Sequence, residues 1–140
     1  RALMLAWAFW MAWSLVRWSR NALSAFMQGG VWQPVARAFW GHATCQMLEH
    51  HRADWAVPGA CAVDLEAGVT AVEEADAMLK RAMVRAARRT LVLADHSKVG
   101  GVAPYHVAEW SDVDTLVTDQ PWPALAERGV SVQVAALPAR

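Results

Sequence analysis

Net charge is what this 140-residue chain most clearly lacks, because thirteen Lys and Arg residues balance thirteen Asp and Glu residues. Proteins that bind the phosphate backbone of nucleic acids usually carry a basic surface, so a neutral chain argues against direct DNA binding by this segment. Hydrophobic residues make up 56% of the sequence, which is ample for one buried core and excludes a disordered tail. We therefore expect a single domain over residues 1–140.

Cysteine is scarce, and the usual catalytic and metal-binding motifs are absent. Cys45 and Cys61 lie too far apart for a CxxC motif, and one pair in a chain of this length is no disulfide framework. We expect reduced, buried thiols in a cytoplasmic protein. The five histidines show no HExxH or similar spacing, and GxSxG, Walker and GxGxxG motifs are missing. The sequence thus predicts no metal site and no bound cofactor.

The amino-terminal segment Ala2–Val16 is uncharged and rich in tryptophan. Spanning a bilayer takes roughly 20 apolar residues, and this shorter run lies between Arg1 and Arg17 with no cleavage site after it. We therefore predict a buried strand at Leu3–Ala6 and a helix at Trp7–Trp18, rather than a signal peptide or membrane anchor. A membrane-associated fragment is the alternative, and it predicts vesicle binding by residues 1–20. Because the chain lacks an initiator Met, we expect it to be part of a longer polypeptide.

Apolar runs of strand length alternate with longer segments of helical period along the rest of the chain. This alternation predicts an α/β domain with a mostly parallel sheet and helices on both faces. The predicted strands are Ala22–Met27, Asp54–Ala62 with an interruption at Pro58 and Gly59, Thr90–Ala94, Val113–Thr118 and Val130–Ala135. The predicted helices are Gly41–His51, Val72–Arg88 and a short one opened by Pro121 and Pro123 and closed by Gly129.

Two of these helices have apolar faces that predict which side chains point inward. In the first helix the inward residues are Ala43, Met47 and Leu48. In the longest helix the apolar stripe consists of Val72, Ala75, Leu79, Ala82, Met83 and Ala86, at spacings of three and four. Acidic residues in the first turns of that helix and arginines in its last turns match the helix dipole. We interpret these arginines as a solvated face.

Ligands of open α/β sheets bind outside the carboxyl ends of the strands, so polar residues that follow strands are the candidates for a site. These are Gly29, Gly30, Asp64, the run Asp95–Lys98, and Asp119. Lys98 could meet a phosphate or a sugar oxygen, or could be a solvated loop residue. Asp76 and Lys80 have the spacing of a helical ion pair, whose default interpretation is an exposed surface pair.

Two linked motifs resemble the carboxy-terminal sensor domain of DeoR-family transcription regulators. The segment Lys80–Met83 reads Lys-Arg-Ala-Met, and the strand after it ends in Ala-Asp-His-Ser-Lys-Val-Gly at Ala94–Gly100. The run Ser111–Asp119 resembles the next family element. Upstream, Gly59–Asp64 and Gly68–Thr70 resemble the family's Gly-Ala-x-Gly-Ile-Asp loop and its Gly-Leu-Thr. The resemblance covers about residues 22 to 135.

The resemblance implies a fold similar to ribose-5-phosphate isomerase and glucosamine-6-phosphate deaminase, used to sense a phosphorylated sugar. The family joins this sensor to an amino-terminal winged helix-turn-helix, which is not found in the chain. We therefore expect a non-enzymatic effector-binding domain, incomplete at its amino end, which contacts DNA only through that missing domain. The partners expected are a sugar phosphate and further copies of the chain, and no membrane.

The effector-binding residues implied are Lys80, Lys98, Asp76, Asp64, Gly29, Gly30, Gly59 and Asp95. Asp76 would orient Lys80, while Asp95 has the alternative role of capping its own loop. Asp76 stands where the family has Glu, and the family's Ser/Gly/Thr-rich phosphate loop is not found. The alternative function is a sugar-phosphate isomerase or deaminase of the same fold, with Asp76 as the acid best placed to serve as general base.

Overall fold

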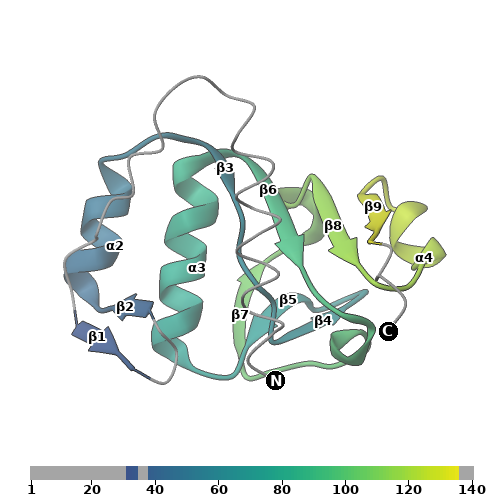
Figure 1. Ribbon diagram of the computed structural model, residues 1–140, viewed down its shortest axis with the longest axis horizontal. Helices are drawn as coiled ribbons and strands as arrows, with labels where there is room; N and C mark the ends of the chain where they lie inside the picture. The colour runs from purple at the N-terminus through teal and green to yellow at the C-terminus, as the bar shows by residue number, and fades with distance from the viewer. Residues whose placement is uncertain (1–30, 35–37, 136–140) are drawn as a thin grey trace.

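The computed structural model describes residues 31–34 and 38–135, which form an α/β fold built around a four-stranded parallel sheet (Figure 1). The order of that sheet is β3 (Ala53–Ala56), β6 (Ala87–Leu93), β8 (Thr115–Thr118) and β9 (Ser131–Val134). All three pairings in it are parallel, so the predicted fold class is confirmed. The predicted strands Thr90–Ala94, Val113–Thr118 and Val130–Ala135 correspond to β6, β8 and β9, with boundaries shifted by a few residues.

The two central strands of this sheet carry its most deeply buried residues. All four residues of β8 are buried, and Leu116 on β8 and Val92 on β6 have no exposed surface. Strands covered on both faces need such continuous apolar runs, which is the pattern that predicted them. The edge strand β3 is exposed along most of its length, and Trp55 stacks with the Arg89 guanidinium 5.3 Å from its ring centroid.

A second, three-stranded antiparallel sheet was not predicted. It consists of β4 (Ala62–Asp64), β5 (Gly68–Ala71) and β7 (Tyr105–Ala108), in that order. The predicted strand Asp54–Ala62 is therefore wrong as one element, since its first half is β3 and its last residue begins β4. Pro58 has no N–H to donate, but its carbonyl accepts from the Leu93 amide at 3.1 Å, and Gly59 then forms an isolated bridge with Leu93.

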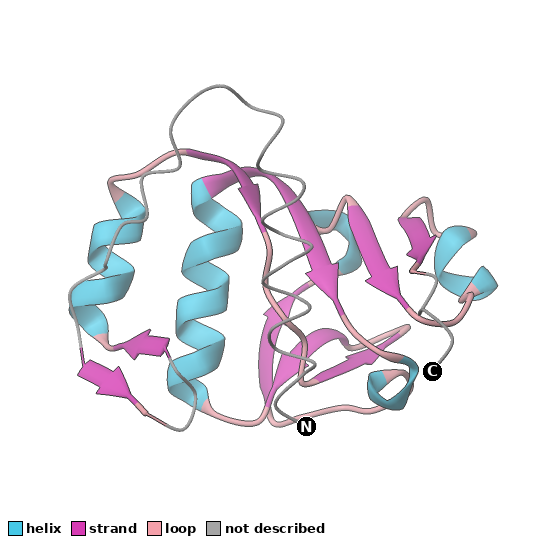
Figure 2. Ribbon diagram, viewed as in Figure 1, coloured by secondary structure: helices cyan, strands magenta, loops and turns pink. Residues whose placement is uncertain are grey.

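Helices α2 (His42–Glu49) and α3 (Glu74–Ala86) lie side by side next to the parallel strands (Figures 1 and 2). The helix predicted over Val72–Arg88 is thus too long at both ends. Its carboxyl end was misplaced because the chain passes from α3 directly into β6 at Ala87, with no glycine between them.

The inward faces of both helices also need correction. Val72 is 62% exposed, whereas Ala77 is completely buried. In α2, Ala43 is exposed and Thr44 is the buried residue. Because α2 and α3 contact each other and α3 also contacts the sheets, each helix buries surface in more than one direction, which a single apolar stripe does not predict.

Short elements complete the described fold. These are η1 (His96–Lys98), η2 (Trp110–Asp112), α4 (Pro123–Ala126), and the antiparallel pair β1 (Val31–Gln33) and β2 (Ala38–Trp40). The short helix predicted between the prolines and Gly129 is confirmed as α4, and Gly129 has the left-handed φ of +89°. The core joins the two sheets through fully buried side chains: Val63, Val69, Val92, Leu116 and Leu125.

The amino-terminal elements predicted at Leu3–Ala6, Trp7–Trp18 and Ala22–Met27 lie outside the described residues, as do Gly29 and Gly30. Among the helices of residues 31–34 and 38–135, none combines the length and apolar character that crossing a membrane requires.

Candidate functional site

The carboxyl ends of the parallel strands bring together loops that are distant in the sequence. The segment after β3 reaches β6, because the Ala60 amide donates to the Leu93 carbonyl at 2.9 Å. At the end of β6, the Ala94 amide donates to the Val117 carbonyl of β8 at 3.1 Å. The loops that carry Gly59, Asp95 and Asp119 are therefore neighbours along one edge of the sheet, which we call the carboxyl rim.

Asp76 and Lys80 form an ion pair beside the first of these loops. The Lys80 Nζ lies 2.5 Å from Asp76 Oδ2, and their side chains are only 13% and 21% exposed. Cys61 completes the cluster, with its Sγ 3.7 Å from Asp76 Oδ2 and 3.8 Å from Lys80 Nζ. The spacing of an ion pair is confirmed, but the default interpretation as an exposed surface pair is wrong, because tertiary packing against the Cys61 loop covers it.

Neither cysteine forms a disulfide, and both are half-buried rather than buried. Burial raises the pKa of the Cys45 thiol, and the nearby Glu49 carboxylate raises it further. Within the described part of the chain, no group of three or more His, Cys, Asp or Glu side chains is arranged to hold a metal ion.

The loop after β6 is shaped by Asp95, which precedes η1. Its Oδ1 accepts hydrogen bonds from the Ser97 amide, at 2.9 Å, and from the Ser97 hydroxyl. The capping role considered for Asp95 is thus confirmed. The Lys98 amide donates to the Asp95 carbonyl at 2.9 Å, so the backbone that carries this lysine is fixed, and its side chain is half-buried.

His96, at the start of η1, is bound to Asp119 at the end of β8. The His96 amide and its ring Nδ1 contact the two different carboxylate oxygens of Asp119, each at 2.6 Å. Burial alone would raise the pKa of Asp119, but the hydrogen bonds from the His96 ring and amide outweigh it and lower that pKa. Asp119 therefore links the loops of two adjacent strands as a carboxylate.

Asp64 has a different environment, in the tight turn between β4 and β5. Its Oδ1 accepts from the Ala67 and Glu66 amides at 3.0 and 2.9 Å, and these two bonds lower its pKa. The carbonyl of Asp64 accepts from the Trp110 Nε1 at 2.9 Å. Its carboxylate is thus engaged in shaping the hairpin.

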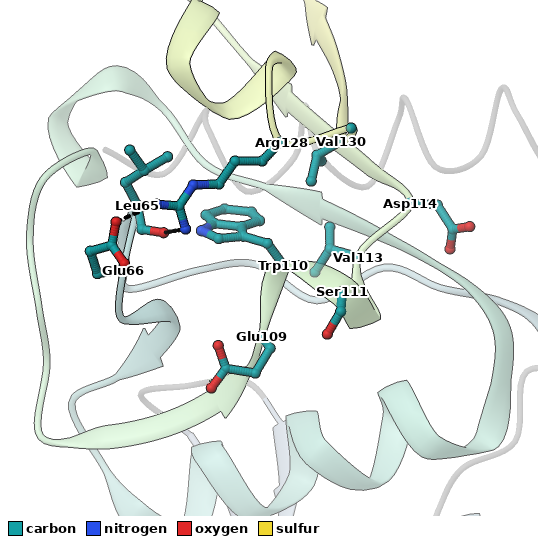
Figure 3. A pocket seen from close by; sticks show the side chains of 10 residues that line it. Leu65, Glu66, Glu109, Trp110, Ser111, Val113, Asp114, Arg128 and Val130 are labelled. Atoms are coloured by element: carbon teal, nitrogen blue, oxygen red, sulfur yellow. Dashed lines mark hydrogen bonds and ion pairs between the residues drawn. The ribbon is translucent and has the colours of Figure 1, made fainter.

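Two cavities lie at the opposite, amino ends of the strands. The larger, of about 710 Å³, is lined by residues that precede β8 and β9, and Figure 3 shows Arg128 reaching across it. The Arg128 guanidinium donates to the Leu65 carbonyl at 2.9 Å and pairs with the Glu66 carboxylate. The other, of about 490 Å³, is lined by residues that include Arg81 and Arg85 of α3 and Arg88 at the start of β6. Neither cavity is lined by a predicted effector residue.

The structure thus brings Asp76 and Lys80 together beside the Gly59 loop, and sets Asp95 and Lys98 in the loop of the neighbouring strand. Asp64 belongs to the antiparallel hairpin, where its neighbour Val63 bridges Val99 next to Lys98, but the Asp64 carboxylate is bound within its own turn. The sequence did not indicate Cys61 as a neighbour of Lys80, nor the pairing of His96 with Asp119. Both members of that pair directly follow predicted strands, which is a signal that could have placed them on one rim.

Residues 16–120 match the family described as the DeoR C terminal sensor domain. The HTH-type transcriptional repressor GlcR of Bacillus subtilis is 32% identical over 101 residues, which cover 72% of this chain and 39% of the repressor. The putative aga operon transcriptional repressor of Escherichia coli O157:H7 is 30% identical over 110 residues, 79% of this chain and 41% of that protein.

A third relative, the glycerol-3-phosphate regulon repressor of Haemophilus influenzae, is 33% identical over 78 residues, 56% of this chain and 31% of the repressor. The chain therefore spans less than half the length of each of these relatives, all of which are named as repressors. The family match covers most of the chain, including the carboxyl rim from Gly59 to Asp119. The chain belongs to the DeoR C-terminal sensor domain family, whose members named above are sugar-related transcription regulators.

Proposed function

We propose that this domain binds a phosphorylated sugar at the carboxyl rim and acts as the effector-sensing part of a regulator of carbohydrate genes. The observation that carries the proposal is the Asp76–Lys80 pair, with Nζ and Oδ2 2.5 Å apart beside the Gly59 loop. DNA would be contacted by a separate winged helix-turn-helix of the complete, homo-oligomeric regulator. Effector binding would change the subunit arrangement and thereby operator affinity.

The buried position of the pair supports an orienting role for Asp76. An exposed ion pair contributes little and leaves a lysine mobile. Here the Lys80 side chain is 13% exposed and also lies 3.8 Å from the Cys61 Sγ, so Asp76 and the loop restrict where its charge can lie. A fixed ammonium group next to a strand-end loop suits a phosphate, since charge-assisted hydrogen bonds are stronger than neutral ones.

Relatives support a carbohydrate-linked effector. Two of them are named as the glycerol-3-phosphate regulon repressor and the L-fucose operon activator of Haemophilus influenzae. The enzyme alternative is less well supported, because its proposed general base, Asp76, already accepts a hydrogen bond from Lys80. A purified regulator that binds sugar phosphates but gives no aldose–ketose turnover would favour the sensor over the enzyme.

Substitution of the two lysines tests the site directly. The full-length regulator is screened by thermal shift against pentose phosphates, hexose phosphates and glycerol-3-phosphate, because a ligand of the native state raises the melting temperature. Each hydrogen bond to a charged group contributes about 1.5–3 kcal/mol, so Lys80→Met and Lys98→Met should each weaken the best panel member roughly 10- to 100-fold.

The charge-matched control is Arg88→Met, which removes one exposed positive charge beside the amino-edge cavity. This variant should bind sugar phosphates as tightly as the wild type if only the positive charges at the carboxyl rim contact the phosphate. If both lysine variants keep the wild-type thermal shift, the site assignment is wrong. If the wild-type regulator responds to none of the sugar phosphates, the proposed effector class is wrong.

Gly59→Ala separates ligand approach from folding. A Cβ built at this glycine meets no atom within 4 Å, and its backbone does not have a left-handed φ, so alanine should fit without loss of stability. If a sugar phosphate approaches the backbone here, the added methyl group should weaken binding about tenfold or more, comparable to overpacking of about 1–3 kcal/mol. Isothermal titration and a melting curve measure the two effects. Unchanged affinity would show that Gly59 lies outside the effector contact.

A further inference from the structure

His96 and Asp119 form a fixed pair in the middle of the carboxyl rim. The Asp119 Oδ1 accepts a hydrogen bond from the His96 amide, and Asp119 Oδ2 contacts the His96 ring Nδ1. Both donor–acceptor distances are 2.6 Å. The Thr118 hydroxyl also contacts Oδ1, at 3.4 Å. Two of these contacts join one residue to both oxygens of one carboxylate, so neither the loop nor the ring is free to turn. Asp119 is therefore the positioning residue for the His96 ring.

The chemistry of this contact determines what the other ring nitrogen can do. An ionised carboxylate only accepts hydrogen bonds, so Nδ1 must carry a proton to bind it. In the neutral imidazole, Nε2 is then the acceptor, as in other sites where a carboxylate selects the tautomer. Among the described residues, Asp119 is the hydrogen-bond partner of this ring, and 55% of the His96 side chain is exposed. The Nε2 atom can therefore accept a hydrogen bond from a hydroxyl group of a ligand.

The pair shares the carboxyl rim with Lys98, two residues after His96, and with the Gly59–Cys61 loop beside Lys80. Asp119 follows β8, His96 follows β6, and the loop of Gly59 and Cys61 lies on the far side of β6. Adjacent strands are about 4.8 Å apart, so these loops span a distance on the scale of one monosaccharide. The charged residues of the two loops that carry the pair are Asp119, Asp95 and Lys98, and the Asp95 carboxylate is already bonded to Ser97.

We propose that His96, positioned by Asp119, is the residue that recognises the sugar part of the effector, by accepting a hydrogen bond from a ring or chain hydroxyl. This inference rests on the proposed function, in which the lysines hold the phosphate. It assigns the two ends of the ligand to different loops. His96 would determine which sugar phosphate binds most tightly. Lys80 and Lys98 would bind the phosphate group, which all sugar phosphates share.

Two substitutions at this position separate anchoring from recognition. In His96→Asn the amide nitrogen occupies the place of Nδ1 and can still donate to Asp119, but nothing replaces Nε2. In His96→Gln the amide group extends to the place of Nε2 and can still accept from a hydroxyl. Affinity for the tightest-binding panel member is measured by isothermal titration of the full-length regulator, with melting curves for each variant.

We expect His96→Asn to weaken binding about tenfold, the effect of losing one hydrogen bond near the upper end of the usual range, without a lower melting temperature. His96→Gln should retain more of the affinity than His96→Asn. Wild-type affinity in His96→Asn, equal losses in both variants, or losses accompanied by a lower melting temperature would each overturn the assignment while leaving the proposed function intact. If the wild type binds no sugar phosphate, the proposed function fails and this inference falls with it.

Discussion

Replacement of Trp110 by alanine should destabilise the domain by about 4 kcal/mol, in the range for removing a buried tryptophan. Trp110 is 7% exposed and lies in η2, between β7 of the antiparallel sheet and β8 of the parallel sheet. Its Nε1 donates to the Asp64 carbonyl at 2.9 Å, and its ring meets that of Trp122 edge-on at 5.7 Å between centroids. The side chain thus connects both sheets and the segment before α4.

The matched variant Trp110→Phe keeps an aromatic ring but removes the N–H donor. Its loss should be smaller, about 1–3 kcal/mol, and come mainly from the Asp64 carbonyl left without its partner. Both free energies of unfolding are measured by urea titration, with unchanged m-values as the sign of an unchanged unfolding reaction. If Trp110→Ala lowered the free energy of unfolding by less than Trp110→Phe does, the ring would not hold the two sheets together.

The parallel sheet could be predicted from the sequence because its central strands are continuous apolar runs. Val92 and Leu116 lie in segments that are buried on both faces, and such segments read as strands without reference to their neighbours. The antiparallel hairpin was missed although Asp64 and Gly68 are typical turn residues at its two ends. Asp64 was interpreted as a polar residue at the end of a parallel strand, and Gly68 only as part of a family motif, so neither predicted a turn.

Only the contacts of the candidate site between residues a few positions apart in the sequence could be predicted. The pairing of Asp76 with Lys80 follows from helical geometry, since residues four apart share a face. The burial of that pair depends on Cys61, fifteen residues before Asp76, and on the path of the chain after β3. The contact of His96 with Asp119 likewise requires β6 and β8 to be neighbours. Such contacts depend on strand order, which the periodicity of one sequence does not specify.

The Gly68→Ala variant should lose about 3 kcal/mol of stability, because it combines backbone strain with a steric clash. Gly68 begins β5 with a φ of +68°, a conformation that L side chains rarely adopt. A Cβ at this position would also lie against the Ala108 carbonyl oxygen, inside van der Waals contact, and 3.3 Å from the Glu109 Cα. Relief of the clash would require β5 and β7 to separate at the end of the antiparallel sheet nearest Trp110.

Gly129→Ala is the control that isolates the strain. Gly129 has a φ of +89°, but a Cβ there meets no atom within 4 Å, so alanine should cost only about 1 kcal/mol. The difference between the two variants, measured by urea unfolding, is the contribution of the clash with β7. Equal losses at both positions would mean that β7 can move away from β5 without cost. The hairpin that holds Asp64 would then be kept in place by its remaining contacts, among them those of the Trp110 and Arg128 side chains.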